Sequence, residues 1–173
     1  AYARLRATFP DWGAVRDASL EDVAEAIRVG GLAQLKAARI QTALRALSER
    51  HEGATTLDYL SDLPLDVARE ELRALPGVGP KTAACVLLFH LGRPAFPVDT
   101  HVWRVTRRLG LIGPKVTADA AHLALEKRIP PEWRHTMHVN LITHGRRVCH
   151  AQRPACDRCD LRARCHYYQQ REG

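Results

Sequence analysis

The chain has no apolar stretch long enough to cross a membrane, since none approaches the roughly 20 consecutive residues that a spanning helix needs. No signal peptide is visible at its start. The alternation of apolar and polar residues that marks a half-buried strand is missing over any useful length. No segment repeats at a fixed period. These absences argue against a membrane protein, a β protein and a repeat array, and they predict an all-α fold.

Cysteines are also few, and they are unevenly placed. There are 5, an odd number, and four of them lie between Cys149 and Cys165. This grouping suits a metal site in a reducing, intracellular compartment better than a disulfide framework. The formal net charge of +7 favours a polyanionic partner, although many basic proteins bind none. Charged residues make up an ordinary 26% of the 173 residues, so the chain is not a disordered basic tail and can bury a core.

Helical signals recur along most of the chain. Ser19, followed by Glu21 and Asp22, predicts the start of a helix from Leu20 to Arg28, which the glycine pair at 30–31 would end. Apolar spacing and turn residues predict further helices at 1–8, in a segment carrying Leu35, Ile40, Leu44 and Leu47 on one face, and at 67–74, 83–91, 100–109, 117–127 and 130–148. After Cys149 the helical periodicity ends and the chain becomes short, polar and rich in cysteine.

The segment Leu75–Thr82, with the sequence LPGVGPKT, joins two of these predicted helices. Gly77 and Gly79 permit backbone angles and close approaches that a side chain forbids. Pro80 suits the first position of a helix. The free N–H groups of such a hairpin point out of the turn and form a seat for a phosphate, immediately before Lys81. Taken alone, the motif is explained more simply as a helix–turn–helix corner with a solvated lysine.

Two further motifs follow. In Pro97–His101, Asp99 is placed to cap the helix 100–109, and capping alone would explain an aspartate there. Six, two and five residues separate the four clustered cysteines, which are Cys149, Cys156, Cys159 and Cys165. Such thiolates can surround one tetrahedral zinc or one [4Fe–4S] cluster, and two local disulfides are the remaining alternative. Cys85 lies in an apolar run and is interpreted as a small buried core residue.

Together, LPGVGPKT, VDTH and the cysteine spacing resemble the endonuclease III branch of the helix–hairpin–helix DNA glycosylases, in the same order and over essentially the whole chain. The resemblance implies a helical barrel domain at 1–115, with the helix–hairpin–helix at about 65–91. It also implies a C-terminal domain at 116–173 with a [4Fe–4S] cluster loop at 149–165. Because Ala1 opens in the middle of a helical pattern, we expect the N-terminal part of the barrel domain to be missing.

The resemblance assigns catalysis to Lys81 and Asp99. Breaking the bond between a base and C1′ builds positive charge on the sugar, which a carboxylate stabilises, while a neutral lysine can attack C1′. The helix N-terminus and partial burial would both favour the neutral amine. Lys81 corresponds to the family's Schiff-base lysine and Asp99 to its catalytic aspartate. Adenine-removing relatives lack this lysine, so the chain is predicted to be a bifunctional glycosylase and AP (apurinic or apyrimidinic site) lyase.

The resemblance also implies ligands. The four clustered cysteines would hold a [4Fe–4S] cluster. Backbone carbonyls of Arg73, Leu75 and Val78 would hold a monovalent cation at the hairpin. The predicted DNA-binding residues are the hairpin residues Gly77, Gly79 and Lys81, the inserted wedge Leu32, and His101, Arg146, His150 and Arg153. In isolation, an exposed leucine in a turn needs no such explanation.

The predicted function is therefore excision of oxidised pyrimidines from duplex DNA, with strand cleavage by β-elimination. Two alternatives stay open. The setting of Asp99 after Phe96, Pro97 and Val98, together with Cys85, also resembles plant demethylating relatives, which makes 8-oxoguanine or 5-methylcytosine alternative bases. A noncatalytic DNA-binding module is the other alternative. The expected partner is double-stranded DNA with damaged bases or abasic sites. We expect a monomer that binds no membrane and works in the cytoplasm or nucleoid if the protein is bacterial.

Overall fold

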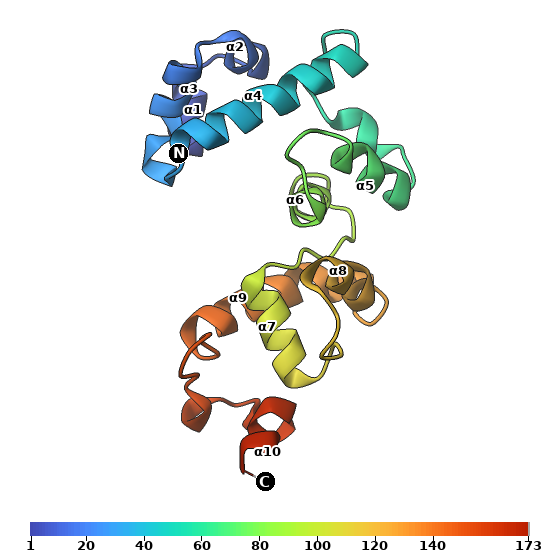
Figure 1. The fold of residues 1–173 in the computed structure, drawn as a ribbon. Helices are drawn as coiled ribbons and strands as arrows, with labels where there is room; N and C mark the ends of the chain where they lie inside the picture. Colours follow the sequence, from blue (N-terminus) through green and yellow to red (C-terminus); the bar gives the residue numbers. More distant parts are fainter. Residues whose placement is uncertain (173) are drawn as a thin grey trace. The chain divides into compact units, whose positions relative to one another are not determined.

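The computed structural model describes residues 1–172, and side chains as far as residue 170. Over these residues the chain forms helices and turns without any strand, which confirms the all-α prediction (Figure 1). Two compact units are present, Ala1–Val78 and a second that begins at Gly79, and each is described by itself. The division near residue 115 implied by the family stays a prediction. No helix in the described part of the chain is long and apolar enough to span a membrane.

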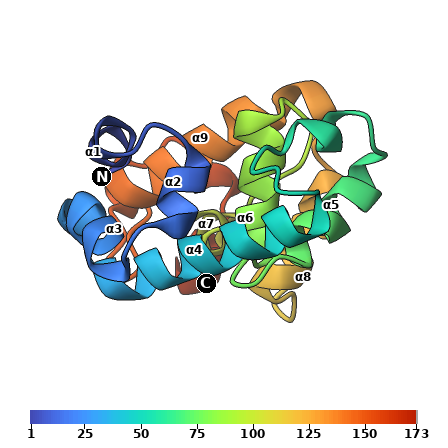
Figure 2. The same cartoon turned by 90° about the horizontal axis from the view of Figure 1, so that it is seen from above.

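The first unit contains five α-helices. They are α1 (Tyr2–Thr8), α2 (Trp12–Asp17), α3 (Leu20–Ile27), α4 (Ala33–Arg50) and α5 (Leu65–Arg73), with 3₁₀ turns at Arg28–Gly30 and Asp58–Ser61. Helices α2 and α3 pack along α4, and α1 packs on α3 (Figures 1 and 2). Ser19 caps α3 as predicted, since its side chain accepts a hydrogen bond from the N–H of Asp22. Helix α2 was not predicted, because six residues are too few to show a helical period.

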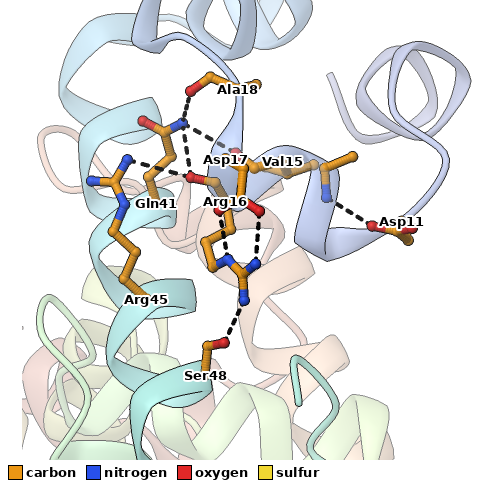
Figure 3. Close-up of polar contacts among 9 residues, drawn as sticks. Asp11, Val15, Arg16, Asp17, Ala18, Gln41, Arg45 and Ser48 are labelled. Atoms are coloured by element: carbon orange, nitrogen blue, oxygen red, sulfur yellow. Dashed lines mark hydrogen bonds and ion pairs between the residues drawn. The ribbon is translucent and has the colours of Figure 1, made fainter. Parts of the chain in front are cut away.

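The buried face of α4 differs from the prediction. Leu47 is buried, but Leu35 is 49% exposed, and the buried positions include the polar residues Gln41 and Ser48. The Gln41 amide donates to the carbonyl oxygens of Val15 at 3.1 Å and Ala18 at 2.8 Å (Figure 3). A buried amide is tolerated when its donors are satisfied. The end of α2 and its cap residue supply these acceptors, and the search for apolar spacing could not have found them.

The second unit contains the remaining helices of the described chain. They are α6 (Pro80–Cys85), which continues as a π-helical turn at Val86–His90, then α7 (Thr100–Leu109), α8 (Ala118–Glu126), α9 (Arg134–Arg147) and α10 (His166–Glu172). Short 3₁₀ turns lie at Pro131–Trp133, Cys156–Arg158 and Arg162–Arg164. Buried side chains from the α6–α7 connection and from α7, α8 and α9 form one core, which includes Phe96, Val102, Val105, Leu125 and Leu141.

Helices α7 and α9 cross closely at a glycine. A Cβ atom on Gly145 of α9 would lie 2.9 Å from the Cβ of His101 and 3.3 Å from Cγ2 of Val105. The guanidinium of Arg104 donates to the Gly145 carbonyl at 2.9 Å, which ties the two helices together. This contact fixes the start of α7, where Asp99 lies, relative to α9, which leads into the cysteine loop.

Candidate active site and metal centre

Lys81 and Asp99 lie in the same neighbourhood of the second unit. Lys81 is in the first turn of α6, and Asp99 caps α7 by accepting a hydrogen bond from the N–H of Val102 at 2.8 Å. Both charges act on the thiol of Cys85 and on the imidazole of His138. The structure thus brings together the two residues that were predicted to be catalytic. The Lys81 side chain is exposed, so the expectation of partial burial was wrong.

Cys85 is part of this neighbourhood rather than of the core. It stands four residues after Lys81 on α6, hence on the same helix face, and it is only partly buried. Burial raises the pKa of the Cys85 thiol, while the charge of Lys81 and a hydrogen bond from it lower that pKa. Because burial dominates, the thiol stays protonated at neutral pH. The prediction of a buried core cysteine was therefore wrong, although its spacing from Lys81 would have indicated the contact.

His138 is a second member of the site that the sequence did not indicate. It projects from α9, is 3% exposed, and its Nδ1 lies 2.8 Å from the carbonyl oxygen of Pro97. Burial lowers the pKa of His138, which outweighs the raising effects of that hydrogen bond and of Asp99. The neutral imidazole therefore fixes the segment that ends in Asp99. The ring of Phe89, in the π-helical turn, packs edge-on against His138 at 5.5 Å.

The two glycines of the hairpin have different local requirements. Gly77 has a φ of +79°, which a residue with a side chain rarely adopts. Gly79 has a φ of −89°, and a Cβ atom there would meet no atom within 4 Å. Within the described residues, the N–H groups of both glycines donate to no backbone carbonyl, whereas that of Val78 donates to Leu75 at 3.1 Å. The hairpin therefore offers free N–H donors beside an open approach. The Leu75 carbonyl, which accepts the hydrogen bond from Val78, is one of the three predicted to hold a monovalent cation, and the cation itself stays a prediction.

The four clustered cysteines line one pocket, together with Arg108, His144 and Tyr167. None of the four forms a disulfide. Cys149 Sγ accepts a hydrogen bond from Arg108 Nη1 at 3.2 Å, and Cys165 Sγ lies 3.4 Å from the Arg108 carbonyl oxygen. In the described part of the chain, no three Cys, His, Asp or Glu side chains converge closely enough for a single metal ion. The sulfurs thus surround a volume instead of meeting at a point.

The predicted DNA-binding residues are mostly accessible. In the first unit, Leu32 is 74% exposed and adopts a left-handed conformation with φ of +52° at the start of α4. In the second unit, Arg146 and Arg153 are exposed, while His101 and His150 are partly buried. Arg153 also has a left-handed backbone, with φ of +48°. Such conformations are costly for residues other than glycine and are common at binding sites.

Comparison with known proteins places these features in a family. The HhH-GPD superfamily of base excision DNA repair proteins matches residues 1–131. The chain is 39% identical over 149 residues to a putative DNA glycosylase of Arabidopsis thaliana, covering 86% of this chain and 50% of that protein. It is 36% identical over 151 residues to endonuclease III of Thermotoga maritima, covering 87% and 66%. It is 32% identical over 175 residues to the DNA glycosylase/AP lyase ROS1 of Arabidopsis thaliana, covering 91% of this chain but only 12% of that one.

Among solved structures, a trapped covalent intermediate of endonuclease III with DNA has a TM-score of 0.81 and 34% sequence identity, covering 99% of this chain and 76% of that one. The chain spans about half the length of the Arabidopsis glycosylase, and less of the other plant relative. The family match covers most of the chain, and the all-helical fold of the described residues agrees with it. The chain therefore belongs to the HhH-GPD superfamily of base excision DNA repair proteins and is a member of its endonuclease III family.

Proposed function

We propose that the protein is a bifunctional DNA glycosylase and AP lyase that acts on duplex DNA. The observation that carries this proposal is the pairing of Lys81 with Asp99, whose charges act on the same two neighbours, Cys85 and His138. The similarity to an endonuclease III that was trapped covalently on DNA supports it. Capping of α7 would by itself explain Asp99 in a noncatalytic binding module, so trapping of a covalent adduct on Lys81 is the measurement that separates the two functions.

The chemistry follows from the two side chains. The neutral amine of Lys81 attacks C1′, the bond between C1′ and the base breaks, and the base leaves with the bonding electrons and takes up a proton. The opened sugar is then a Schiff base on Lys81, from which β-elimination releases the 3′ phosphate. Asp99 Oδ1 is used to cap α7. The other oxygen of that carboxylate is the one that would face the positive charge developing on the sugar.

We further propose oxidised pyrimidines as the substrate bases, because endonuclease III of Thermotoga maritima is similar over 87% of this chain. The similarity to plant glycosylases keeps 8-oxoguanine and 5-methylcytosine as alternative bases. A panel of duplexes, each with a single altered base, decides among them when it is incubated with the full-length protein. Preferential release of a base other than an oxidised pyrimidine would overturn this choice while leaving the lyase proposal intact.

The cysteine loop fits a [4Fe–4S] cluster. Zinc would require its sulfur ligands about 2.3 Å from one point, and no such convergence is present among the described residues. Four free thiols around one pocket are instead the donor set of a four-iron cluster. Cys149, Cys156, Cys159 and Cys165 would hold it. When bound, it would supply a rigid cross-link for a loop that has little apolar core of its own.

The basic cysteine loop and the α3–α4 turn are the proposed DNA contacts outside the hairpin. Arg146, His150 and Arg153 would bind phosphates, which position a duplex without reading its sequence. Leu32 would insert between bases where the target nucleotide is flipped out, and its exposure together with its left-handed backbone supports this role.

The decisive experiment is sodium borohydride trapping on DNA that contains one abasic site. The wild-type protein should form a covalent adduct, and Lys81→Gln should abolish the adduct and strand cleavage while largely preserving DNA binding. Asp99→Asn keeps an N-cap acceptor and should slow base release by roughly 10²-fold or more, yet retain lyase activity on a preformed abasic site. Undiminished trapping by Lys81→Gln would mean that another amine is the nucleophile.

A further inference from the structure

Four cations project from α4, and three of them are held by the protein itself. Lys36 Nζ donates to the carbonyl oxygen of Gly30 at 2.6 Å, which closes the turn before the helix. Arg45 Nη2 donates to the carbonyl oxygen of Arg16 at 3.3 Å (Figure 3), and Arg50 Nη2 donates to that of Ala74 at 3.2 Å. The fourth cation, Arg39, has no ion pair or hydrogen bond from its guanidinium among the described residues.

The aliphatic part of Arg39 is nevertheless fixed. Its Cβ, Cγ and Cδ atoms lie 3.7, 3.6 and 3.8 Å from the position that a Cβ atom on Gly77 would occupy. Three successive carbons at nearly equal distance mean that the side chain runs across Gly77. Because glycine leaves this surface flat, the stem packs on the hairpin while the charged end remains exposed. Both residues belong to the first unit.

We propose that Arg39 is a second ligand for the DNA phosphate that the hairpin binds. This inference rests on the proposed function, since it requires the hairpin to hold a phosphate. The N–H of Gly77, which donates to no described backbone carbonyl, would supply one hydrogen bond. The guanidinium of Arg39, carried beside it by the stem contact, would supply a second, charged one.

The position of Arg39 on α4 also predicts where on the DNA this phosphate lies. Leu32 is the N-cap of α4 and Arg39 lies seven residues later, which places their Cα atoms about 10 Å apart along the helix axis. That length corresponds to roughly three base steps of B-DNA at 3.4 Å each. If Leu32 marks the flipped nucleotide, Arg39 should contact a phosphate two to four linkages away, a range of one base step, about 3.4 Å, on either side of the expected value.

The test is equilibrium binding to a duplex that contains a tetrahydrofuran abasic analogue, which cannot form a Schiff base. Loss of one phosphate contact lowers the slope of log affinity against log salt concentration by about 0.9. If the variant and the wild type bind equally at 1 M salt, the variant should therefore bind roughly eightfold more weakly at 0.1 M salt. Arg39→Ala should show both effects. Arg45→Ala is the matched control, because it removes the same charge from the same helix, and it should change binding less than about twofold.

Two further measurements separate the charge from the packing of the stem and locate the phosphate. Arg39→Met keeps an apolar stem over Gly77 without the charge and should bind as weakly as Arg39→Ala, whereas Arg39→Lys should recover most of the affinity. Neutral methylphosphonate linkages are then placed one at a time near the abasic analogue. At the linkage that Arg39 contacts, the methylphosphonate should weaken binding by the wild type more than binding by Arg39→Met, because the variant keeps only the hairpin N–H contacts to that phosphate.

Several results would overturn the inference. The first is an equal loss of DNA affinity in Arg39→Ala and Arg45→Ala, and the second is wild-type affinity in Arg39→Met. The third is that each methylphosphonate weakens Arg39→Met as much as it weakens the wild type. The proposed catalytic function is judged separately, by borohydride trapping. A protein that traps normally but shows no effect at Arg39 refutes only this inference. A protein that binds through Arg39 but does not trap refutes only the proposed catalysis.

Discussion

Gly110→Ala should destabilise the second unit through one defined clash. Gly110 ends α7 with φ of +78°. A Cβ atom there would lie 2.2 Å from Nδ1, 2.4 Å from Cε1 and 2.8 Å from Cγ of His166. His166 begins α10, directly after Cys165, and α10 packs on α7. The alanine would therefore push against a ring attached to the last residue of the cysteine loop.

The magnitude has two parts. A residue with a side chain in the left-handed region costs about 1–2 kcal/mol, and forcing a packed group aside costs about 1–3 kcal/mol more. For a chain of this size each kcal/mol lowers the melting temperature by about 2–4 °C. Gly110→Ala should thus lower it by about 4–20 °C. Gly92→Ala is the control, since Gly92 also has a positive φ, +61°, but open space around it. It should lose only about 2–8 °C.

Thermal unfolding followed by circular dichroism measures both variants, and the double variant Gly110→Ala/His166→Ala tests the cause. Removing the ring should bring the double variant back to the level of Gly92→Ala. Equal melting temperatures for the two single variants would refute the clash. So would a double variant that is no more stable than Gly110→Ala.

Three further predictions concern the metal, the DNA contacts and pH. The anaerobically purified protein should absorb broadly near ~400 nm and contain about four irons per chain, and stoichiometric zinc without iron would contradict the cluster. Arg153→Ala should weaken DNA binding and lower the log–log salt slope by about one without changing the order of preferred bases. Burial holds the pKa of His138 below its ordinary value of 6.5. The unfolded chain therefore binds more protons just below pH 6.5, and stability should fall as the pH drops through that window. His138→Asn should reduce this loss in urea titrations at pH 7 and pH 5, whereas an unchanged loss would exclude His138 as its source.

The sequence predicted the elements that carry their own start and stop signals. The cap at Ser19, the cap at Asp99 and the glycine at 110 all have the predicted roles. Elements without such signals were missed. Helix α2 has only six residues, and α10 follows a polar loop in which no apolar period appears. The π-helical turn at Val86–His90 was also missed, because a run of apolar residues looks the same whether the helix is regular or widened.

The catalytic pair was predictable because each member lies in a short motif, whereas its surroundings depend on distant residues. His138 is separated from Pro97, its hydrogen-bond partner, by 41 residues. Arg39 lies 38 positions before the glycine on which it packs (77 − 39 = 38). Neither contact follows from periodicity, because helical spacing predicts which residues share a face but not what that face meets. Cys85 is different, since its distance of four residues from Lys81 on one helix was already visible.

Substituting the two hairpin glycines one at a time tests binding of the proposed DNA phosphate separately from the stability of the fold. The φ of Gly77, +79°, requires a glycine at this position, so Gly77→Ala should cost about 1–2 kcal/mol of stability.

Gly79 has an ordinary φ of −89° and open space where a Cβ would lie, so no described contact of the protein requires glycine there. If a phosphate approaches its N–H, Gly79→Ala should fold with an unchanged melting temperature. It should nevertheless bind abasic-analogue DNA at least roughly eightfold more weakly at 0.1 M salt, because the methyl group displaces one phosphate contact. Wild-type affinity in Gly79→Ala would mean that no phosphate lies against this hairpin, and the interpretation of Arg39 would fail with it.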